Sequence, residues 1–309
     1  MDRLCRGSAT VRALVLVASL LAGCVSLADE GGPWEPIETI TGGLTPEVGP
    51  PATIAATASC TLRVATWNVH FGADPHELAA AIAAAPRIAR ADVLLLQEIE
   101  DHTLDDEATT RASRIATELG MTWIYAPART EDFGTHGIAT LARFPLTDAT
   151  IRRLPHYDQL IRPRERNALS TYVELGTQRL QIVNIHLDVR IGPGDRIRQL
   201  HPAVNEIDER VIAAGDFNTN PWAWSNGIIP LAGTEAIVGQ QQAAVVDDYL
   251  EGKAFSSAID ADTATMRLPA FEIRTDNLYA RALPILAAGV EHVGGSDHWP
   301  VWFDVDLCD

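Results

Sequence analysis

Short apolar runs of strand length alternate along the chain with polar clusters that precede or follow them. Each run is rich in leucine or β-branched residues and is bounded by turn residues, which is the pattern of buried β-strands. The clearest runs occupy residues 62–65, 93–96, 180–183, 211–214 and 301–305. Helix signals lie between them, so the chain is of the α/β class. This pattern alone leaves a doubly wound sheet nearly as well supported as two sheets packed face to face.

The helix signals differ in clarity along the chain. Helices are predicted from Asp74-Pro75 to about residue 85, over 106–119, and over 195–209 with an interruption at Pro202. A short helix is predicted over 222–229. Residues 235–275 show no clear pattern.

Five polar motifs mark the ends of the apolar runs. They are Trp67-Asn68-Val69-His70, Gln97-Glu98, Asn184-Ile185-His186-Leu187, Gly215-Asp216-Phe217-Asn218 and Ser296-Asp297-His298-Trp299-Pro300. Strands that end in amide, carboxylate and imidazole groups indicate a sheet edge where polar side chains converge. The five motifs, in this order over residues 62–306, resemble the endonuclease/exonuclease/phosphatase superfamily, the metal-dependent phosphoesterases similar to DNase I. The resemblance implies a four-layered α/β sandwich of two packed, mainly antiparallel sheets with helices outside.

The implied metal site centres on Glu98. An ionised carboxylate at the end of so apolar a strand requires a partner, and Mg²⁺ prefers oxygen ligands. The resemblance implies that Asn68 assists Glu98 and that Asp297 is a further ligand. We expect Mg²⁺ as the cofactor, with Mn²⁺ or Ca²⁺ as alternatives.

The implied catalytic groups centre on His298, as general base or as the group that stabilises the attacked phosphate. Asp276 corresponds to the family's orienting aspartate, although Asn277 departs from the aromatic residue that usually follows it. Asp216 and Asn218 are two residues apart, so on an extended segment their side chains point the same way. The resemblance implies that this pair orients the attacking water and that His186 donates to a phosphate oxygen.

Two further groups keep two interpretations each. Arginines over 152–166 either guide an anionic substrate or form a solvated loop. Trp222 and Trp224 either line a substrate cleft or, the favoured interpretation, pack in the core.

The predicted function is hydrolysis of a phosphodiester or phosphomonoester bond. The net charge of −17 argues against broad, salt-driven binding to nucleic acid, but an exported nuclease acting on DNA or RNA remains an alternative. A catalytically silent lipoprotein that binds a partner or nucleotide is a second alternative. No cysteine falls among the polar motifs, which argues against a thiol enzyme.

The first 24 residues resemble a bacterial lipoprotein leader. Arginines precede a short apolar segment, and Leu21-Ala22-Gly23-Cys24 matches the lipobox. We therefore predict a signal peptide over 1–23, a lipid-anchored tether over 24–60 and a catalytic domain over 61–309. The expected protein is an exported, monomeric cell-envelope lipoprotein, attached to a membrane through Cys24.

Cys60 and Cys308 remain as a pair. Cys60 lies eight residues before Asn68 and Cys308 ten residues after His298. If Asn68 ends the first strand and His298 precedes the last, and both lie at the active-site rim, the strands are antiparallel and their far ends bring the cysteines together. An oxidising, exported compartment permits a disulfide there.

Overall fold

A computed structural model describes residues 45–308 except 52–59, 71–73, 103–109, 132–133, 158, 161–163 and 230–240. The expected signal peptide, Cys24 and most of the expected tether lie outside the described residues, as does the beginning of the helix predicted over 106–119. None of the described helices is long and apolar enough to span a membrane.

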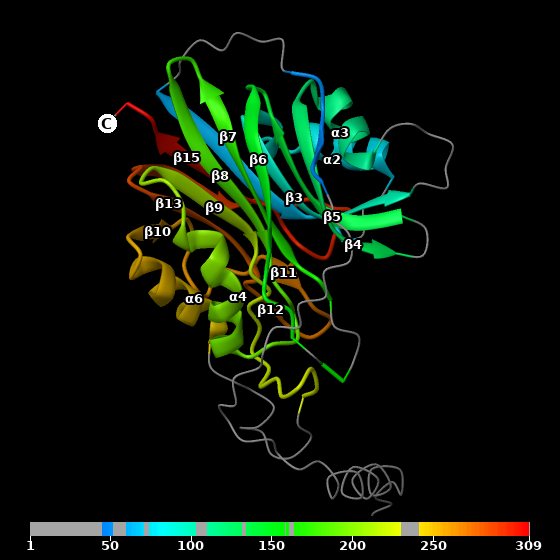
Figure 1. Cartoon of the computed structure of the whole chain (residues 1–309), viewed down its shortest axis with the longest axis vertical. Coiled ribbons are helices and arrows are strands. Elements are labelled where there is room, and N and C mark those ends of the chain that lie inside the picture. The colour runs from blue at the N-terminus through cyan, green and yellow to red at the C-terminus, as the bar shows by residue number, and fades with distance from the viewer. Residues whose placement is uncertain are drawn as a thin grey trace, which may run out of the picture.

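Two large sheets form the centre of the domain (Figure 1). The first has the order β1 (Glu47–Val48), β4 (Thr122–Glu131), β5 (Gly134–Ala142), β3 (Val93–His102), β2 (Thr61–Asn68), β15 (Val301–Asp306) and β14 (Ile285–Val290). The second has the order β10 (Phe255–Ser257), β13 (Asp276–Arg281), β9 (Val211–Asp216), β8 (Gln178–His186), β7 (Asn167–Leu175) and β6 (Leu146–Arg153). A separate hairpin pairs β11 (Met266–Arg267) with β12 (Glu272–Ile273). Among the described strands, only β2–β3 and β8–β9 pair in parallel.

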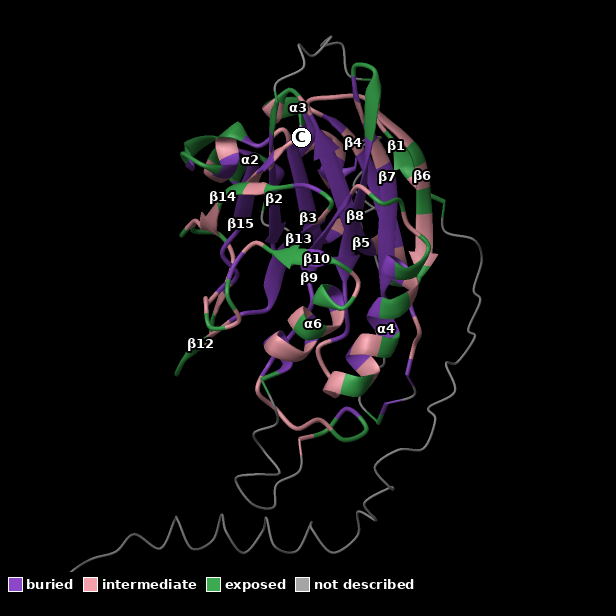
Figure 2. Ribbon diagram, turned by 90° about the vertical axis from the view of Figure 1, so that its left-hand side faces the viewer, coloured by how far each residue is buried: buried purple, intermediate pink, exposed green. Residues whose placement is uncertain are grey.

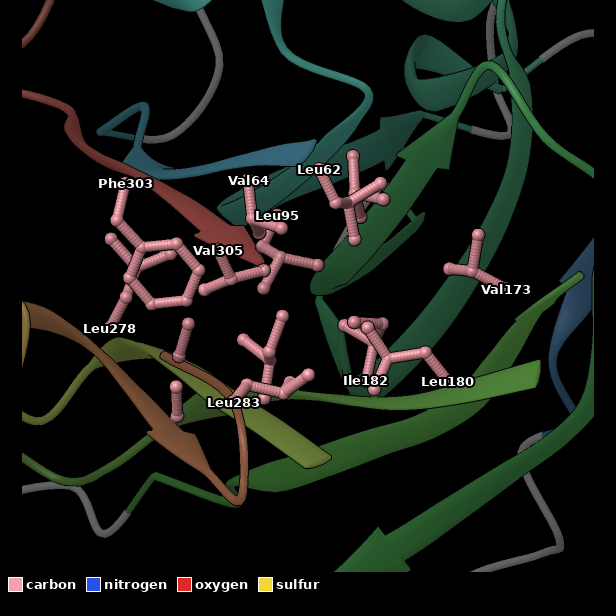
Figure 3. Packing of buried hydrophobic residues seen from close by; sticks show 14 of the residues in the cluster. Leu62, Val64, Leu95, Val173, Leu180, Ile182, Leu278, Leu283, Phe303 and Val305 are labelled. Carbon is pink, nitrogen blue, oxygen red and sulfur yellow. The ribbon is translucent and has the colours of Figure 1, made fainter. Parts of the chain in front are cut away.

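The sheets pack face to face over an apolar core. Alternate residues of β2 and β3 enter this core, among them Val64 and Leu95, and they meet residues of the second sheet such as Ile182 and Leu278 (Figure 3). The intervening residues of the same strands, including Trp67, face the other way. This two-residue alternation is what a sheet buried on both faces requires.

Helices cover the two outer faces. α2 (Pro75–Ala84) and α3 (Arg111–Leu119) pack on the first sheet, and α4 (Pro193–Asn205) and α6 (Gln242–Glu251) pack on the second. Figure 2 shows the sheets buried between these partly exposed helices. The predicted four-layered α/β sandwich is confirmed.

Two local predictions were wrong, and one stretch without a prediction forms regular structure. Residues 222–229 form a turn with a β-bridge between Ser225 and Ile228, because the Asn220 side chain accepts from the Trp222 N–H and turns the chain. α4 runs through Pro202 and ends at Asn205. The stretch 235–275, which showed no clear pattern, contains α6.

The strand directions gather the polar motifs at one end of both sheets. Asn68, His186 and Asp216 are the last residues of β2, β8 and β9, and Asp276 is the first residue of the antiparallel strand β13. His298 lies just before β15. The order and direction of the strands therefore bring the polar motifs together, as expected from their positions at strand ends.

The opposite end of the first sheet carries a disulfide. Thr61 of β2 pairs with Asp306 of the antiparallel strand β15, and Cys60 and Cys308 flank this pair with their Cα atoms 5.2 Å apart. Their sulfurs are bonded, across a sequence separation of 248 residues. The disulfide therefore joins the start of β2 to the end of β15, the last strand of the sheet along the chain.

Replacing both cysteines, Cys60→Ser with Cys308→Ser, should lower the free energy of unfolding by about 2–5 kcal/mol, because the bridge restricts the unfolded chain. Urea unfolding of the two proteins at neutral pH measures the difference. Equal midpoints and slopes would contradict a stabilising role for the bridge.

Candidate active site

Glu98 is aimed by an irregularity in its strand. The register of β3 against β5 shifts between Gln97 and Ile99, and Glu98 adopts a φ of 60°. A bulge of this kind redirects a side chain, and positive φ is uncommon in a residue other than glycine. Glu98 is only 8% exposed, and its buried Oε2 has no hydrogen-bond partner among the described residues.

His186 stands between Glu98 and Asp216. Its Nε2 lies 3.8 Å from Glu98 Oε1 and 3.6 Å from Asp216 Oδ2. Arg166, only 4% exposed, places Nη1 2.9 Å from Nδ1 and 2.8 Å from Nε2 of the same ring. Burial, followed by the charge of Arg166, holds the pKa of His186 well below its usual value, so the imidazole is neutral at physiological pH.

Three hydrogen bonds hold the Asp216 carboxylate. Its Oδ2 accepts from Asn68 Nδ2 at 2.8 Å and from Asn218 Nδ2 at 3.1 Å, and its Oδ1 accepts from the Asn218 N–H at 2.7 Å. Burial, together with the nearby Asp276 charge, raises the pKa of Asp216 to about 7. A carboxyl group that titrates near neutrality can hold or release a proton at physiological pH.

His298 forms a tight pair with Asp276. Its Nδ1 lies 2.8 Å from Asp276 Oδ2, which also accepts from the hydroxyls of Thr275 at 2.7 Å and Thr265 at 2.9 Å. Burial would lower the pKa of His298, but the Asp276 carboxylate, with Asp216 and Asp297, outweighs it and raises the pKa to about 10. The imidazole is therefore positively charged at neutral pH in this arrangement.

The structure brings most of the predicted residues together. Those that converge are Asn68, Glu98, His186, Asp216, Asn218, Asp276 and His298. Asp297 is placed differently, because its half-exposed carboxylate pairs with His70 Nδ1 at 3.2 Å. The Asn68 amide contacts Asp216 and the His70 N–H, and no contact with Glu98 is described.

Other site residues were not given a role from the sequence. His136 places a ring nitrogen within 4.8 Å of ligand atoms of both Glu98 and His186. Thr265 comes from the stretch with no clear pattern. The arginines over 152–166 separate: Arg166 enters the site, whereas Arg152 donates to the Pro202 carbonyl at 2.7 Å at the end of α4.

A buried amide bridge connects the two sheets behind the site. Gln97 Nε2 donates to Asn184 Oδ1 at 2.8 Å, and Asn184 Nδ2 donates to the Ala139 carbonyl at 2.9 Å. Both side chains are fully buried. Gln97 precedes Glu98 directly and Asn184 lies two residues before His186, so the bridge sets the spacing of these two groups across the sheets. The sequence signal for this bridge was the presence of Gln97 and Asn184 next to otherwise apolar runs.

The donor set fits a divalent cation. Two clusters offer ligand atoms that lie within 4.8 Å of one another, one formed by Glu98, His136 and His186 and the other by Asp216, Asp276 and His298. Glu98 Oε2 and Asp276 Oδ1 are buried acceptors without a hydrogen-bond partner among the described residues. Buried carboxylate oxygens in this state are stabilised by a positive ion.

The sequence and the geometry agree on a family. Residues 65–298 match the model of the Endonuclease/Exonuclease/phosphatase family, and the chain belongs to that family. Its members are hydrolases that act on phosphoester bonds. No curated protein is similar enough in sequence to count as a match.

Solved structures share the fold. The endonuclease/exonuclease/phosphatase from Beutenbergia cavernae DSM 12333 has a TM-score of 0.59 at 20% identity, over 80% of this chain and 72% of that one. A family protein from Leptotrichia buccalis C-1013-b has a TM-score of 0.57 at 15% identity, over 80% and 100% of the two chains. ANGEL2, described as a 2',3'-cyclic phosphatase, has a TM-score of 0.56 at 15% identity, over 80% and 95%. These likenesses concern the fold alone.

The His298–Asp276 pair predicts a dependence of stability on pH in metal-free protein. The pKa of His298 is raised from 6.5 to about 10, so its protonation stabilises the fold fully below pH 6.5, and this stabilisation is lost as the pH rises through 10. Asp276→Asn removes the carboxylate that raises the pKa. The loss of unfolding free energy between about pH 8 and pH 10 should therefore shrink in this variant.

Urea unfolding in EDTA across that range measures the slope. Asp304→Asn, which removes a carboxylate paired with Arg63 instead, serves as the control and should keep the wild-type slope. A wild-type slope in Asp276→Asn would show that the pair does not set the protonation of His298.

Proposed function

We propose that the protein is a magnesium-dependent phosphoesterase that hydrolyses a phosphodiester or phosphomonoester bond. The observation that carries this proposal is the convergence of Glu98 and His186 with Asp216, Asp276 and His298 at one end of the two sheets. Membership of the Endonuclease/Exonuclease/phosphatase family supports it.

Glu98 is the proposed principal ligand of the metal, because its unpartnered Oε2 is buried at the bulge. Mg²⁺ is the proposed ion, since one or two carboxylates suffice to hold it, and Mn²⁺ or Ca²⁺ can take its place. When bound, the cation neutralises phosphate charge and favours attack by water. Asn68 and Asp297 are the proposed additional ligands. Asn68 would offer Oδ1, which now accepts from the His70 N–H, and its Nδ2 can keep its bond to Asp216. Asp297 would have to leave its present contact with His70.

Asp216 is the proposed proton acceptor for the attacking water. Asn68 and Asn218 hold its carboxylate in place, and its pKa of about 7 suits a group that accepts a proton at neutral pH. His298, positively charged and oriented by Asp276, is then suited to stabilise the charge that develops on the phosphate. His186 and Arg166 supply further donors on the Glu98 side.

Hydrolysis should require the metal and should respond differently to two substitutions. Glu98→Gln should weaken Mn²⁺ binding at least about tenfold and lower the rate, because it removes the charged ligand. His298→Ala should lower kcat by about 10²–10³-fold while leaving the Kd for Mn²⁺ within about twofold, because it removes a donor that stabilises developing charge. Calorimetric titration with Mn²⁺ and nitrophenol release from bis(4-nitrophenyl) phosphate measure the two effects.

Glu174→Gln is the matched control and should behave as wild type. The Glu174 side chain accepts a hydrogen bond from the Thr147 hydroxyl in the β6–β7 pair, away from the site. The same assay with 4-nitrophenyl phosphate compares diester with monoester cleavage. Equal Mn²⁺ affinity in wild type and Glu98→Gln would refute the ligand assignment. Absence of cation-dependent release from both esters would favour the alternative of a silent binding protein.

We also propose that the protein acts outside the cytoplasm, attached to a membrane through lipidated Cys24. The support is the order of basic, apolar and small residues before that cysteine. Cys24→Ser should move the protein from the membrane fraction to the soluble fraction of bacterial cells, as measured by fractionation and immunoblotting. Membrane association that persists in Cys24→Ser would contradict the anchor.

A further inference from the structure

Three aromatic side chains form a partly exposed cluster beside the site. The rings of Trp222 and Trp224 lie 6.2 Å apart, and those of Trp222 and Phe271 lie 6.1 Å apart. We call Trp222, Trp224 and Phe271 the aromatic rim. Phe271 is 44% exposed, and the two tryptophans are half-buried.

The aromatic rim is separate from the cores of the domain. None of its three residues belongs to a hydrophobic core cluster of the described residues. The interpretation favoured from the sequence, core packing of the tryptophans, is therefore wrong. Large aromatic side chains that stay accessible in a group are characteristic of ligand-binding surfaces.

One side of the aromatic rim is fixed to the Asp216–Asn218 segment. Trp224 Nε1 donates to Asn220 Oδ1 at 2.8 Å, and the same oxygen accepts from the Trp222 N–H. Asn220 Nδ2 in turn donates to the Asn218 carbonyl at 2.9 Å. The tryptophans are thus held directly beside a residue of the catalytic end.

The other side is fixed to the segment that carries His298. Phe271 lies at the tip of the β11–β12 hairpin, where the Leu268 N–H donates to its carbonyl. Met266 of β11 forms a β-bridge with His298, and the Arg267 N–H donates to the Asp297 carbonyl at 2.9 Å. The Trp222–Phe271 contact therefore spans the two segments that contribute Asn218 and His298.

The chemistry of the rim is apolar and uncharged. Residues 268–271 of the hairpin tip are Leu-Pro-Ala-Phe. The charged residues next to them, Arg267 and Glu272, pair with each other at 3.2 Å. A surface of this kind has no charge to attract a phosphate chain, and it gains free energy by covering an apolar group.

We infer that the aromatic rim binds the organic part of the substrate, and that this part is an aromatic or otherwise apolar group esterified to the phosphate. This inference rests on the proposed function, because it assigns the phosphate to the Glu98–His298 site. Trp222 and Phe271 are then specificity-determining residues, because they contact the organic part of the substrate and not the phosphate. A substrate with a small polar alcohol leaves the rim uncovered and binds more weakly.

The test measures binding of two phosphonates that share a head group and differ in the organic part. Methylphosphonate and 1-naphthylphosphonate are titrated calorimetrically into the full chain loaded with Mg²⁺. Wild type should bind the naphthyl compound about tenfold more tightly than the methyl compound, from burial of the ring. Trp222→Ala and Phe271→Ala should reduce this ratio to about two or less and leave the Kd of methylphosphonate unchanged.

Leu286→Ala is the matched control, because Leu286 is an exposed apolar residue on β14, 53% accessible, and is not part of the rim. It should keep the wild-type ratio. If Trp222→Ala does not fold, Phe271→Ala still tests the inference, because Phe271 lies at an exposed hairpin tip.

Three results would overturn the inference. Equal affinities of wild type for the two phosphonates would refute the aromatic rim as a substrate subsite. Cation-dependent release of nitrophenol from the aryl esters, measured on the same protein, would show that the proposed function still stands. An affinity ratio that neither Trp222→Ala nor Phe271→Ala changes would also refute the subsite. Loss of binding to phosphatidylcholine vesicles in the variants, with an unchanged phosphonate ratio, would replace a substrate subsite by a membrane contact.

Discussion

The candidate active site depends on holding two separate sheets in one register, and the buried bridge between Gln97 and Asn184 holds them directly behind the site. Apolar packing between the sheets tolerates small sliding movements, because dispersion and burial have little directional preference. A buried amide pair does not, since a displaced donor or acceptor loses its partner where no water can replace it. The Asn68–Asp216 bond crosses between the same two sheets nearer the site. Together these contacts fix Glu98 relative to His186 and Asp216.

The electrostatics of the site divide it into two halves of opposite character. On one side, burial and the charge of Arg166 keep His186 neutral, even though Glu98 and Asp216 lie close to its ring. On the other, the charged His298 is surrounded by the carboxylates of Asp216 and Asp276. Two histidines with the same intrinsic chemistry are thereby set to opposite protonation states at neutral pH by burial and neighbouring charges. The candidate site therefore offers one imidazole donor without charge and one with charge.

The sequence was most informative where strand pattern and polar motif coincided. The strand over 301–305 and the residues at the ends of β8 and β9 were predicted well, because a short apolar run followed by a polar residue leaves few alternatives. The bulge that aims Glu98 was not predictable, since it depends on pairing with β5, far along the chain. Thr265, which supports Asp276, comes from a segment organised by tertiary contacts, such as the ion pair of Arg274 with Asp247. The loop at 222–229 was misassigned because the Asn220 side chain competes with helical hydrogen bonding.

The disulfide between Cys60 and Cys308 also means that the two ends of the domain meet, with 5.2 Å between the Cα atoms. This junction lies at the end of the first sheet opposite the polar motifs. The domain is therefore close to a covalently closed ring, and its starting point is geometrically arbitrary. A circular permutation could join the present ends and open the chain at the β7–β8 turn, Gly176-Thr177, which lies at the end of β8 remote from His186. Such a rearranged chain would keep every group of the candidate site in place, and its synthesis would begin and end with strands of the second sheet.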